Sequence, residues 1–390
     1  DFFVYGIGYA EHATLPDNHW DVIQELGQMG FKVNPETARC QTLGDVENYY
    51  NEWTVKKETL GYDVDGVVVK LNAFKYQRHL GNMSREPRWA IAYKFPATQQ
   101  VTRLKKIGLN VGRTGSINPY AELEPVNIGG VTVRTATLHN EDDIRRKDIR
   151  EGDLVTVERA GEVIPRVIAP VVSERTGNER EFAMPAICPV CSGRIVRHDG
   201  ETASYCINTA CTAQFARLLI HFIGRGAMDI EGMGQRLALS LIDTGIVQDV
   251  GDIYSITKDQ LLALERIGSR SAENVLASIE KSKSRPLANI LTALGIRHVG
   301  YETADLLASR FGNIHLLIKA IEEELAAIPG VGPKIAKSIV THFQQDQNRT
   351  VINKLNAAGV WLESNAAIGG SAQSTPEVTS RASKVVAITE

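Results

Sequence analysis

The chain has 390 residues, which is long enough for two to four domains that each bury a core of their own. Hydrophobic residues make up 43% and charged residues 23%, as in ordinary globular proteins, and no apolar run is long enough to cross a bilayer. The formal net charge of -3 excludes a protein that coats polyanions by bulk electrostatics, so any contact with nucleic acid must come from local patches and backbone amides.

The first hundred residues contain predicted helices and two predicted strands. Apolar spacing predicts one helix that ends at Gly30 and another over 43–53. The β-branched run at 64–71 predicts a strand buried on both faces, and a second strand follows at 89–96. We therefore expect a mixed α and β domain over 1–97.

Each of these strands carries a lysine that packing does not explain. Lys70 follows three valines, where an unpaired ammonium is costly, and Lys94 comes shortly before the proline that closes the second run. Asp65 and Gly66 add a carboxylate and a position where a ligand can approach the backbone closely. Either lysine alone could be an edge residue whose ammonium reaches solvent. The two together indicate a cationic cleft for phosphate.

A small barrel is predicted between residues 98 and 186. Gly129-Gly130 between two alternating runs predicts a hairpin. Five strands within about ninety residues are typical of a closed barrel, and the OB-fold is the common nucleic-acid-binding form. The five runs lie at 104–111, 121–128, 131–138, 154–159 and 163–172.

Four cysteines predict a structural metal site over 187–216. Cys188 and Cys191 form a C-x2-C pair, Cys206 and Cys211 form a C-x4-C pair, and 14 residues separate the pairs. Two such turns complete the tetrahedron that Zn²⁺ prefers, and four thiolates leave no open position for catalysis. The intervening segment suits a short hairpin that folds only with the metal. Two disulfides or four unrelated thiols are the alternatives, and the fifth cysteine, Cys40, is expected to be a small buried apolar residue.

Glycine-centred turns recur between amphipathic helices over 217–365. A helix, a hydrophobic-Gly-x-Gly hairpin and a second helix define the helix-hairpin-helix module, whose helix N-termini offer amides to phosphate. Such turns can also merely join helices, but four of them indicate duplex binding. The candidate residues are Gly232, Gly234, Gly268, Gly300, Gly330, Gly332 and Lys334. Residues 366–390 are predicted to be a linker that ends in a strand at 384–389.

Two motifs carry a resemblance to a known family. Asp65-Gly-Val-Val-Val-Lys70 and Ala92-Tyr-Lys94-Phe-Pro96 resemble nucleotidyltransferase motifs of bacterial NAD-dependent DNA ligases, and the order of the later regions is similar to that family. The resemblance implies a multidomain α+β protein. Its parts would be the C-terminal part of an ATP-grasp-like adenylation domain, an OB-fold barrel, a zinc finger with four cysteine ligands and an all-α helix-hairpin-helix domain, with the final strand beginning a BRCT module.

The resemblance also implies roles for individual residues. Lys70 and Lys94 would contact the adenylate as catalytic residues, with Asp65 and Gly66 beside it, and Lys57 stands where the family carries an arginine. Because the 390 residues contain no K-x-D-G tetrapeptide, the nucleophilic lysine is absent, and we expect a partial chain that does not self-adenylate. Arg113, Thr114 and Arg159, which lie beside glycines, would contact phosphates that flank a nick.

The expected function is the sealing of nicks in duplex DNA through enzyme-AMP and DNA-adenylate intermediates during replication and repair. It implies NAD⁺, structural Zn²⁺ and Mg²⁺ or Mn²⁺ as cofactors, and nicked double-stranded DNA as partner. A monomer in the bacterial cytoplasm, close to the nucleoid, is expected. Two alternatives stay open: a non-catalytic duplex-binding fragment, and a structure-specific nuclease that would need a carboxylate cluster such as Glu141-Asp142-Asp143.

Overall fold

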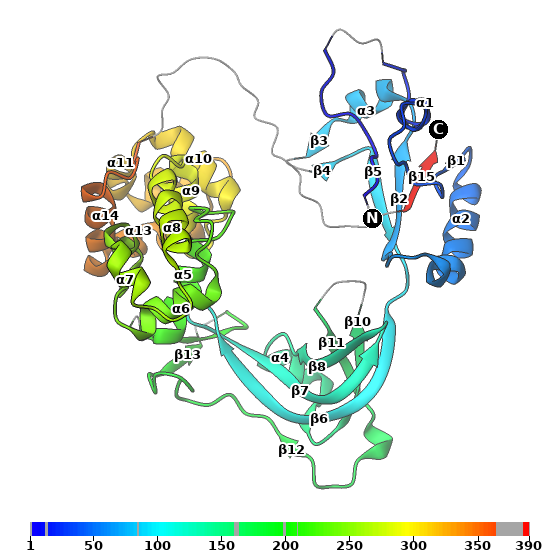
Figure 1. Cartoon of the computed structure of the whole chain (residues 1–390). Coiled ribbons are helices and arrows are strands. Elements are labelled where there is room, and N and C mark those ends of the chain that lie inside the picture. The colour runs from blue at the N-terminus through cyan, green and yellow to red at the C-terminus, as the bar shows by residue number, and fades with distance from the viewer. Residues whose placement is uncertain are drawn as a thin grey trace.

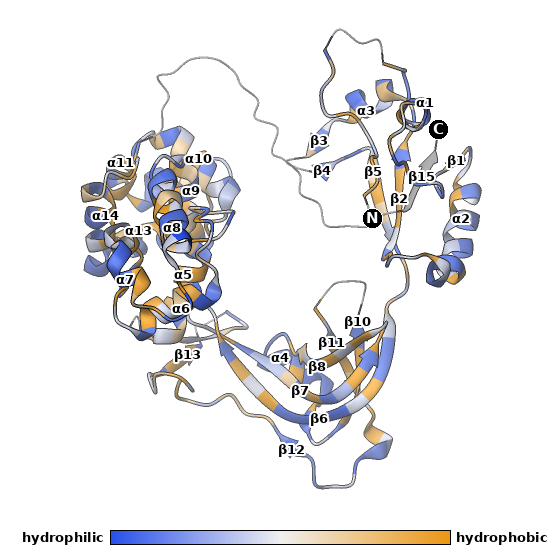
Figure 2. Cartoon of the chain, in the orientation of Figure 1, coloured by the Kyte–Doolittle hydropathy of each residue, from blue (hydrophilic) through white to orange (hydrophobic). Residues whose placement is uncertain are grey.

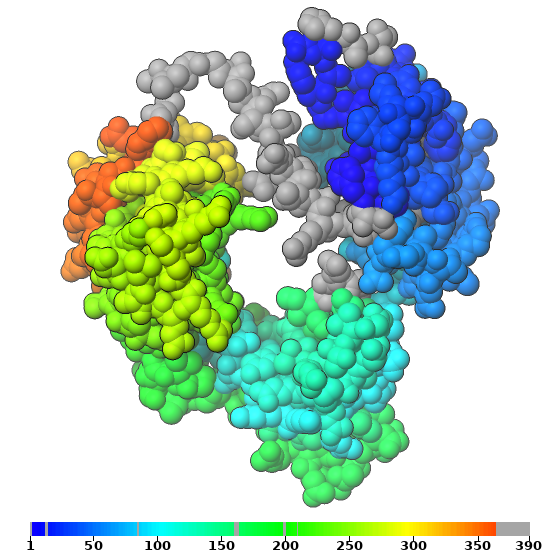
Figure 3. All heavy atoms as spheres, viewed as in Figure 1, coloured from blue at the N-terminus to red at the C-terminus, as the bar shows by residue number. Residues whose placement is uncertain are grey.

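The computed structural model describes residues 2–11, 15–83, 86–159, 164–197, 200–208, 210–363 and 385–389. Three lobes follow one another along the chain (Figure 1). The first lobe leads through β5 (Ala90–Lys94) into a β-barrel, and a helical lobe begins with α5 (Thr212–Phe222). In the space-filling view the first and helical lobes face each other across an open space, and the barrel joins them below (Figure 3). No helix in the described ranges has the length and apolar character that a membrane crossing needs.

The first lobe is built on a four-stranded sheet of order β1-β15-β2-β5. β2 pairs antiparallel with β5, which places Gly66 opposite Lys94 and Lys70 opposite Ala90. Both predicted helices are present: Gly30, with φ of 88°, follows the first one, and Thr42 caps the second. The elements are α1 (His19–Gln28), β1 (Ala38–Cys40), α2 (Leu43–Lys56), the 3₁₀ helix η1 (Lys57–Thr59), β2 (Gly66–Leu71), α3 (Phe74–Leu80), β3 (Asn82–Met83), β4 (Glu86–Pro87), β5 (Ala90–Lys94) and β15 (Val385–Thr389).

The last strand lies in an unexpected place. β15 pairs in parallel with both β1 and β2, so it lies in the sheet of the first lobe. The strand expected over 384–389 is present, but the sequence did not predict its place in this sheet, because a short β-branched run favours a strand without indicating which sheet the strand joins. Its expected role as the start of a BRCT module stays a prediction. The linker expected over 366–383 lies outside the described residues.

The barrel is closed by five strands in the order β7-β6-β10-β11-β8, with β8 pairing back to β7. Hydropathy alternates along β6 and β7 (Figure 2), as expected of strands with one face toward a core, and Leu104, Val155 and Val167 are fully buried there. The OB-fold prediction is confirmed. The elements are β6 (Thr98–Val111), β7 (Ser116–Ile128), β8 (Val131–Thr137), α4 (Glu141–Lys147), β9 (Arg150–Glu151), β10 (Leu154–Arg159), β11 (Arg166–Pro170), the 3₁₀ helix η2 (Val172–Glu174) and β12 (Arg180–Glu181).

Helix α4 was not predicted from the sequence, in which its first three residues were described only as a cluster of carboxylates. Asn140 caps this helix by accepting a hydrogen bond from the Asp143 amide, and the three acidic residues occupy its first turn, where they suit the helix dipole. The helix has only 7 residues and buries only Ile144, so no apolar period could reveal it.

A short hairpin follows the barrel, as the cysteine spacing predicted. β13 (Ile195–Arg197) and β14 (Ser204–Cys206) pair antiparallel, and β14 also pairs with β7 at the edge of the barrel. Helix α5 begins directly after Cys211, so the expected boundary at 216/217 falls within that helix.

The helical lobe packs around one large apolar core. All four helices expected after the glycine turns are present, as α6, α8, α10 and α13. The elements are α5 (Thr212–Phe222), α6 (Gln235–Asp243), the 3₁₀ helix η3 (Val250–Ser255), α7 (Lys258–Leu262), α8 (Ser269–Ser282), α9 (Leu287–Ala293), α10 (Tyr301–Phe311), α11 (Ile314–Lys319), α12 (Glu322–Ala326), α13 (Pro333–Gln344) and α14 (Asp346–Ala357).

Candidate functional sites

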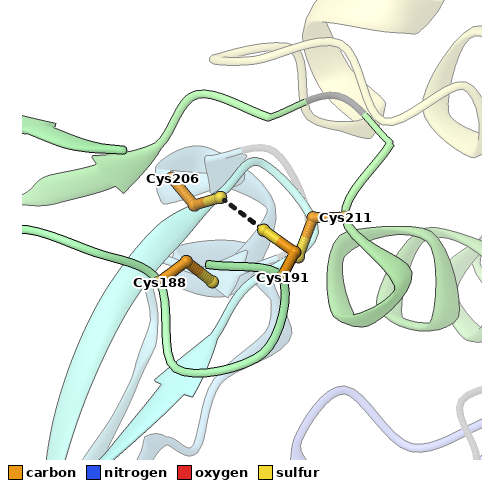
Figure 4. A group of neighbouring side chains, drawn as sticks. All are labelled: Cys188, Cys191, Cys206 and Cys211. Atoms are coloured by element: carbon orange, nitrogen blue, oxygen red, sulfur yellow. Dashed lines mark hydrogen bonds between the residues drawn. The ribbon is translucent and has the colours of Figure 1, made fainter. Parts of the chain in front are cut away.

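The four cysteines of the two pairs converge on one point between the barrel and the helical lobe. Figure 4 shows their side chains directed toward one another: Cys188 and Cys191 come from one turn, Cys206 from β14 and Cys211 from the residue before α5. Their Sγ atoms all lie within 4.8 Å of one another, and those of Cys191 and Cys206 are 3.5 Å apart. Zn–S bonds of about 2.3 Å in a tetrahedron place sulfur atoms about 3.8 Å apart, so the cluster fits a metal ion with four thiolate ligands after small adjustments.

The first cysteine turn is tightly specified by its backbone. The Cys188 amide donates to the Gly193 carbonyl at 2.7 Å, and the Ser192 amide donates to the Cys188 carbonyl at 3.0 Å. A Cβ on Gly193 would lie 2.8 Å from Asn208 Cβ and 3.2 Å from Cys191 Sγ, so only glycine fits there. The sequence motif therefore includes a glycine that the cysteine spacing alone did not reveal.

The protonation of the thiols also suits a cation. A hydrogen bond from the Gly193 backbone is the main cause that lowers the pKa of Cys191, to about 6. Burial raises the pKa of Cys206 to about 12 and also raises that of Cys211. Four thiolates packed this closely would repel one another, so the cluster needs a cation to be stable in its ligating form.

Lys70 and Lys94 lie on the same face of the β2–β5 ladder. Cross-strand partners share a face, and residues two apart on a strand return to it, so the Gly66–Lys94 and Lys70–Ala90 pairs place both lysines on one side. Lys70 is 7% exposed, whereas the Lys94 side chain is 54% exposed. The structure thus places the two lysines that the sequence singled out on one face, four residues apart along the ladder.

The remaining candidates of the first lobe lie at the Lys94 end of these strands. Lys94 Nζ is 2.7 Å from Asp65 Oδ2, and the Phe95 amide donates to the Asp65 carbonyl. Lys57 Nζ lies 5.3 Å from the centroid of the Phe95 ring. Gly66 is required by the neighbouring strand, because a Cβ there would lie 2.5 Å from the Tyr93 carbonyl oxygen. The close approach expected at Gly66 is therefore made by β5.

Two side chains near Lys70 were missed by sequence reasoning. His19 Nε2 lies 3.4 Å from Lys70 Nζ, and the same ammonium lies 4.9 Å from the centroid of the Tyr5 ring. Burial, and secondly the charge of Lys70, lower the pKa of His19 to about 4, so the imidazole is neutral beside the ammonium. No sequence signal could have found this pair, because 51 residues separate its members.

The barrel candidates do not form one cluster. Arg113 and Thr114 occupy the turn between β6 and β7, whereas Arg159 pairs with Thr98 at the opposite end of β6. Arg113 Nη1 lies 3.4 Å from Nδ1 of His221 on α5. His221 Nε2 is 2.8 Å from the Thr292 carbonyl oxygen, to which it donates, so Nδ1 is free to accept from Arg113. Arg113 therefore links the barrel to the helical lobe.

Four helices of the helical lobe begin at a glycine with no side-chain cap. Each of these glycines has a negative φ, and a Cβ added to it would meet nothing within 4 Å. Neither backbone strain nor packing within the described residues therefore requires glycine there. The four N-caps are Gly234 of α6, Gly268 of α8, Gly300 of α10 and Gly332 of α13.

Two other hairpin glycines have a conformational role. Gly232 has φ of 81° and Gly330 has φ of 94°, and other residue types rarely adopt such angles. They fold each turn so that the following N-cap glycine and the first helical amides lie open. Lys334 adds a cation in the first turn of α13. The sequence prediction thus combined glycines with two different physical roles.

The acidic residues that a nuclease would need are already paired. Arg197 holds Asp142 through two contacts, at 2.8 and 2.5 Å, and Asp143 pairs with Arg146 and Lys147. Glu141 accepts from the Met184 amide and lies near Arg145. Within the described ranges, the four cysteines are the group of His, Cys, Asp or Glu that could hold a metal ion. The nuclease alternative has no support from this geometry.

Family profiles match each of the three lobes. The NAD-dependent DNA ligase adenylation domain matches residues 1–98, and the NAD-dependent DNA ligase OB-fold domain matches 101–179. The SAM-like helix-hairpin-helix tandem matches 225–281, and the helix-hairpin-helix motif matches 289–352.

Curated relatives with the name DNA ligase match most of the chain. The relative from Dehalococcoides mccartyi is 50% identical over 376 residues, which cover 94% of this chain and 55% of the relative. The relative from Pelotomaculum thermopropionicum is 48% identical over 369 residues, covering 92% and 54%. That from Bacillus mycoides is 46% identical over 358 residues, covering 92% and 53%. The chain spans about half the length of the curated relatives it matches.

Proposed function

Because the chain belongs to the family of NAD-dependent DNA ligases, we propose that its first lobe binds the adenylate of NAD⁺ and that its barrel and helical lobe bind nicked duplex DNA. The observation that carries the proposal is the shared face of Lys70 and Lys94 on the β2–β5 ladder. Two ammonium groups on one face offer charge to a phosphate, and the buried one acts with little screening by water.

In this proposal each side chain of the first lobe has a definite task. Lys70, held beside neutral His19, presents a fixed charge to the adenylate phosphate. The Lys94 ammonium donates to Asp65 and would also donate to the phosphate. Its hydrogen bonds could therefore shift between the two as the negative charge on the phosphate redistributes. Lys57 lies at the same end and adds a more distant cation. Mg²⁺ or Mn²⁺ would supply further neutralisation of phosphate charge.

We assign duplex binding to the glycine-capped helix starts. Their first amides have no intrahelical partner and point away from the helix, so they can bond phosphate oxygens without reading the bases. A glycine in open space is explained if a DNA backbone lies against it. Arg113 and Thr114 would contact phosphates where the barrel meets the helical lobe, whereas Arg159 would contact phosphate at the opposite end of β6. This mode of binding needs little net positive charge and so agrees with the charge of -3.

We assign Zn²⁺ to Cys188, Cys191, Cys206 and Cys211, where it would balance the thiolate charges and hold the hairpin of β13 and β14 between the barrel and the helical lobe. The domains would be 1–97, 98–186, 187–216, 217–365 and 366–390, with the third boundary moved to residue 211 because α5 is one continuous helix. Four thiolate ligands leave no position for substrate, so this metal would have no catalytic role.

Three measurements on the purified chain test the proposal. Isothermal titration with AMP should give saturable binding that Lys70→Met weakens, and crystals soaked with AMP should place its phosphate between Lys70 and Lys94. Incubation with NAD⁺ labelled in the adenylate should leave no covalent label, because the 390 residues contain no K-x-D-G lysine. AMP bound far from both lysines, or covalent labelling of the chain, would refute it.

A further inference from the structure

One carboxylate in the hairpin of β13 and β14, called the finger hairpin below, forms ion pairs with two cations of the helical lobe. Each cation lies beside a different helix N-cap glycine. Glu201, just before β14, has a side chain that is 15% exposed. Its Oε2 lies 2.5 Å from Nη2 of Arg297, which precedes the N-cap Gly300. Its Oε1 lies 3.4 Å from Nζ of Lys334, which follows the N-cap Gly332. The two cations thus lie at the N-terminal ends of α10 and α13: Arg297 lies in the turn before α10, and Lys334 lies in the first turn of α13.

These two cations are held to different degrees. Arg297 Nη2 also lies 2.7 Å from the Tyr205 hydroxyl, and its guanidinium carbon lies 4.2 Å from the centroid of the Tyr205 ring. Arg297 is therefore fixed by stacking as well as by charge. Lys334 is 66% exposed and has the longer contact, which is worth little in water. An external anion could take Lys334 from Glu201 without disturbing Arg297.

The Glu201 carboxylate occupies a position in which a phosphate of a DNA backbone could accept hydrogen bonds from Arg297 and Lys334. A carboxylate and a phosphate oxygen accept the same donors from arginine and lysine. Gly300 and Gly332 cap the two helices without a side-chain partner and with open space at their Cα atoms. Burial works to raise the pKa of Glu201, but the hydrogen bond and charge of Arg297 outweigh it and lower the pKa to about 2. Glu201 is therefore negatively charged throughout the neutral pH range.

We propose that Glu201 is an internal substitute for a DNA phosphate, which neutralises Lys334 and Arg297 in the free chain and gives up Lys334 when a duplex binds. The proposal rests on the duplex binding proposed above. It makes Glu201 a residue that lowers affinity for DNA backbone in general, because every bound phosphate must compete with it for Lys334 and is repelled by its charge.

The test is the affinity for a fluorescein-labelled nicked duplex, measured by anisotropy over a series of salt concentrations. Glu201→Gln should bind about 10-fold more tightly, and its log–log salt slope should steepen by about 0.9 as Lys334 pairs fully with a phosphate. Glu280→Gln is the matched control. It removes the same charge from a carboxylate that pairs with Lys283 at the far end of α8, and it should leave the affinity unchanged.

Two further variants keep the test decisive if Glu201→Gln alters folding. Glu201→Asp retains the charge but shortens the side chain, so it should release Lys334 and give an intermediate gain in affinity. Lys334→Gln should cost more affinity in the Glu201→Gln background than in the parent chain, because in the parent chain the contact of Lys334 with a phosphate is offset by the loss of its contact with Glu201. Equal or weaker binding by both Glu201 variants, or an equal gain from Glu280→Gln, would overturn the inference. A parent chain that does not bind the duplex would instead refute the proposed function.

Discussion

In the proposed function, the first lobe and the helical lobe offer phosphate two different kinds of partner. The β2–β5 ladder offers side-chain ammonium groups, one of which, Lys70, is almost fully buried. The helical lobe offers backbone amides at the N-termini of helices whose N-cap is a glycine with open space around it. A buried charge is costly to desolvate but can act on one defined atom of a small ligand. Exposed backbone amides are hydrated when no ligand is bound, so they carry no desolvation penalty. They suit a long ligand with a repeating phosphate backbone.

Helix starts within the helical lobe also differ in how they are capped. η3, α7 and α11 are capped by the side chains of Asp249, Thr257 and Asn313. α6, α8, α10 and α13 begin at glycine instead, although glycine is not a better cap than these residues. The lobe thus gives up cap stability where a phosphate would replace the cap. Four predictions test whether the two lobes are as different as this comparison implies.

Loss of the metal should have the largest effect. It should weaken duplex binding by the helical lobe but leave AMP binding by the first lobe almost unchanged. Structural zinc contributes about 10 kcal/mol or more to the folding of small sites. Cys191→Ser, or treatment with a zinc chelator, should unfold the finger hairpin and weaken nicked-duplex binding by about 100-fold or more, while AMP affinity stays within about twofold. Metal content by mass spectrometry and both affinities are the measurements. Full duplex affinity in a metal-free chain would show that the helical lobe needs no support from the finger.

Acid should destabilise both lobes through one buried histidine in each. Burial and the charge of Lys70 lower the pKa of His19 to about 4, and burial alone lowers that of His342 to about 4, from a reference value of 6.5. A depressed pKa contributes stability that is present above pH 6.5 and is lost as the pH falls toward 4. Each lobe should lose up to about 3 kcal/mol over that range.

Urea unfolding at pH 7 and pH 4.5 measures this loss, with Trp361 fluorescence as the probe of the helical lobe and Trp53 as a probe of the first. His342→Gln should flatten the pH dependence of the Trp361 signal alone. Lys70→Met should reduce the acid sensitivity of the first lobe, because it removes the charge that disfavours protonation of His19. Identical pH profiles for parent and variants would contradict the assignment.

The two lysines of the ladder should differ in their effect on AMP. Lys70→Met should weaken AMP binding by about 30-fold, because water screens the attraction between a buried ammonium and a phosphate only weakly. Lys94→Met should weaken it by about fivefold, because Lys94 is half exposed and already bound to Asp65. Calorimetry measures both, and neither variant should change the affinity for duplex DNA. A larger effect from Lys94 would show that burial does not set the strength of this site.

The smallest expected effects separate the two kinds of helix start. Gly332→Ala should cost about 0.5 kcal/mol of stability but weaken duplex binding by about 10-fold, because the added methyl group stands where a phosphate would lie. Thr257→Ala should cost about 1 kcal/mol of stability and leave duplex binding unchanged, because α7 has a side-chain cap. Thermal unfolding and anisotropy provide the two readouts. Equal losses of duplex affinity would remove the distinction.

Much of the architecture followed from sequence because its signals are local. The barrel strands, the cysteine pairs with their hairpin and the four helices after the glycine turns each have a pattern within a few residues. Helix α4 escaped because its short run buries only Ile144. The position of β15 escaped because strand pairing is decided by partners far away in the chain.

By itself, the sequence determined that Lys70 and Lys94 stand out from their strands, that two cysteine pairs have the spacing of a metal site and that glycines punctuate the helices. Only the tertiary structure decided that the two lysines share a face, that His19 lies beside Lys70 and that Glu201 joins two glycine turns. It also separated the glycines that a positive φ requires from those that stand in open space. The physical reason is that charge and backbone propensity belong to single residues, whereas a contact between side chains 51 or 96 residues apart exists only after the intervening chain has folded.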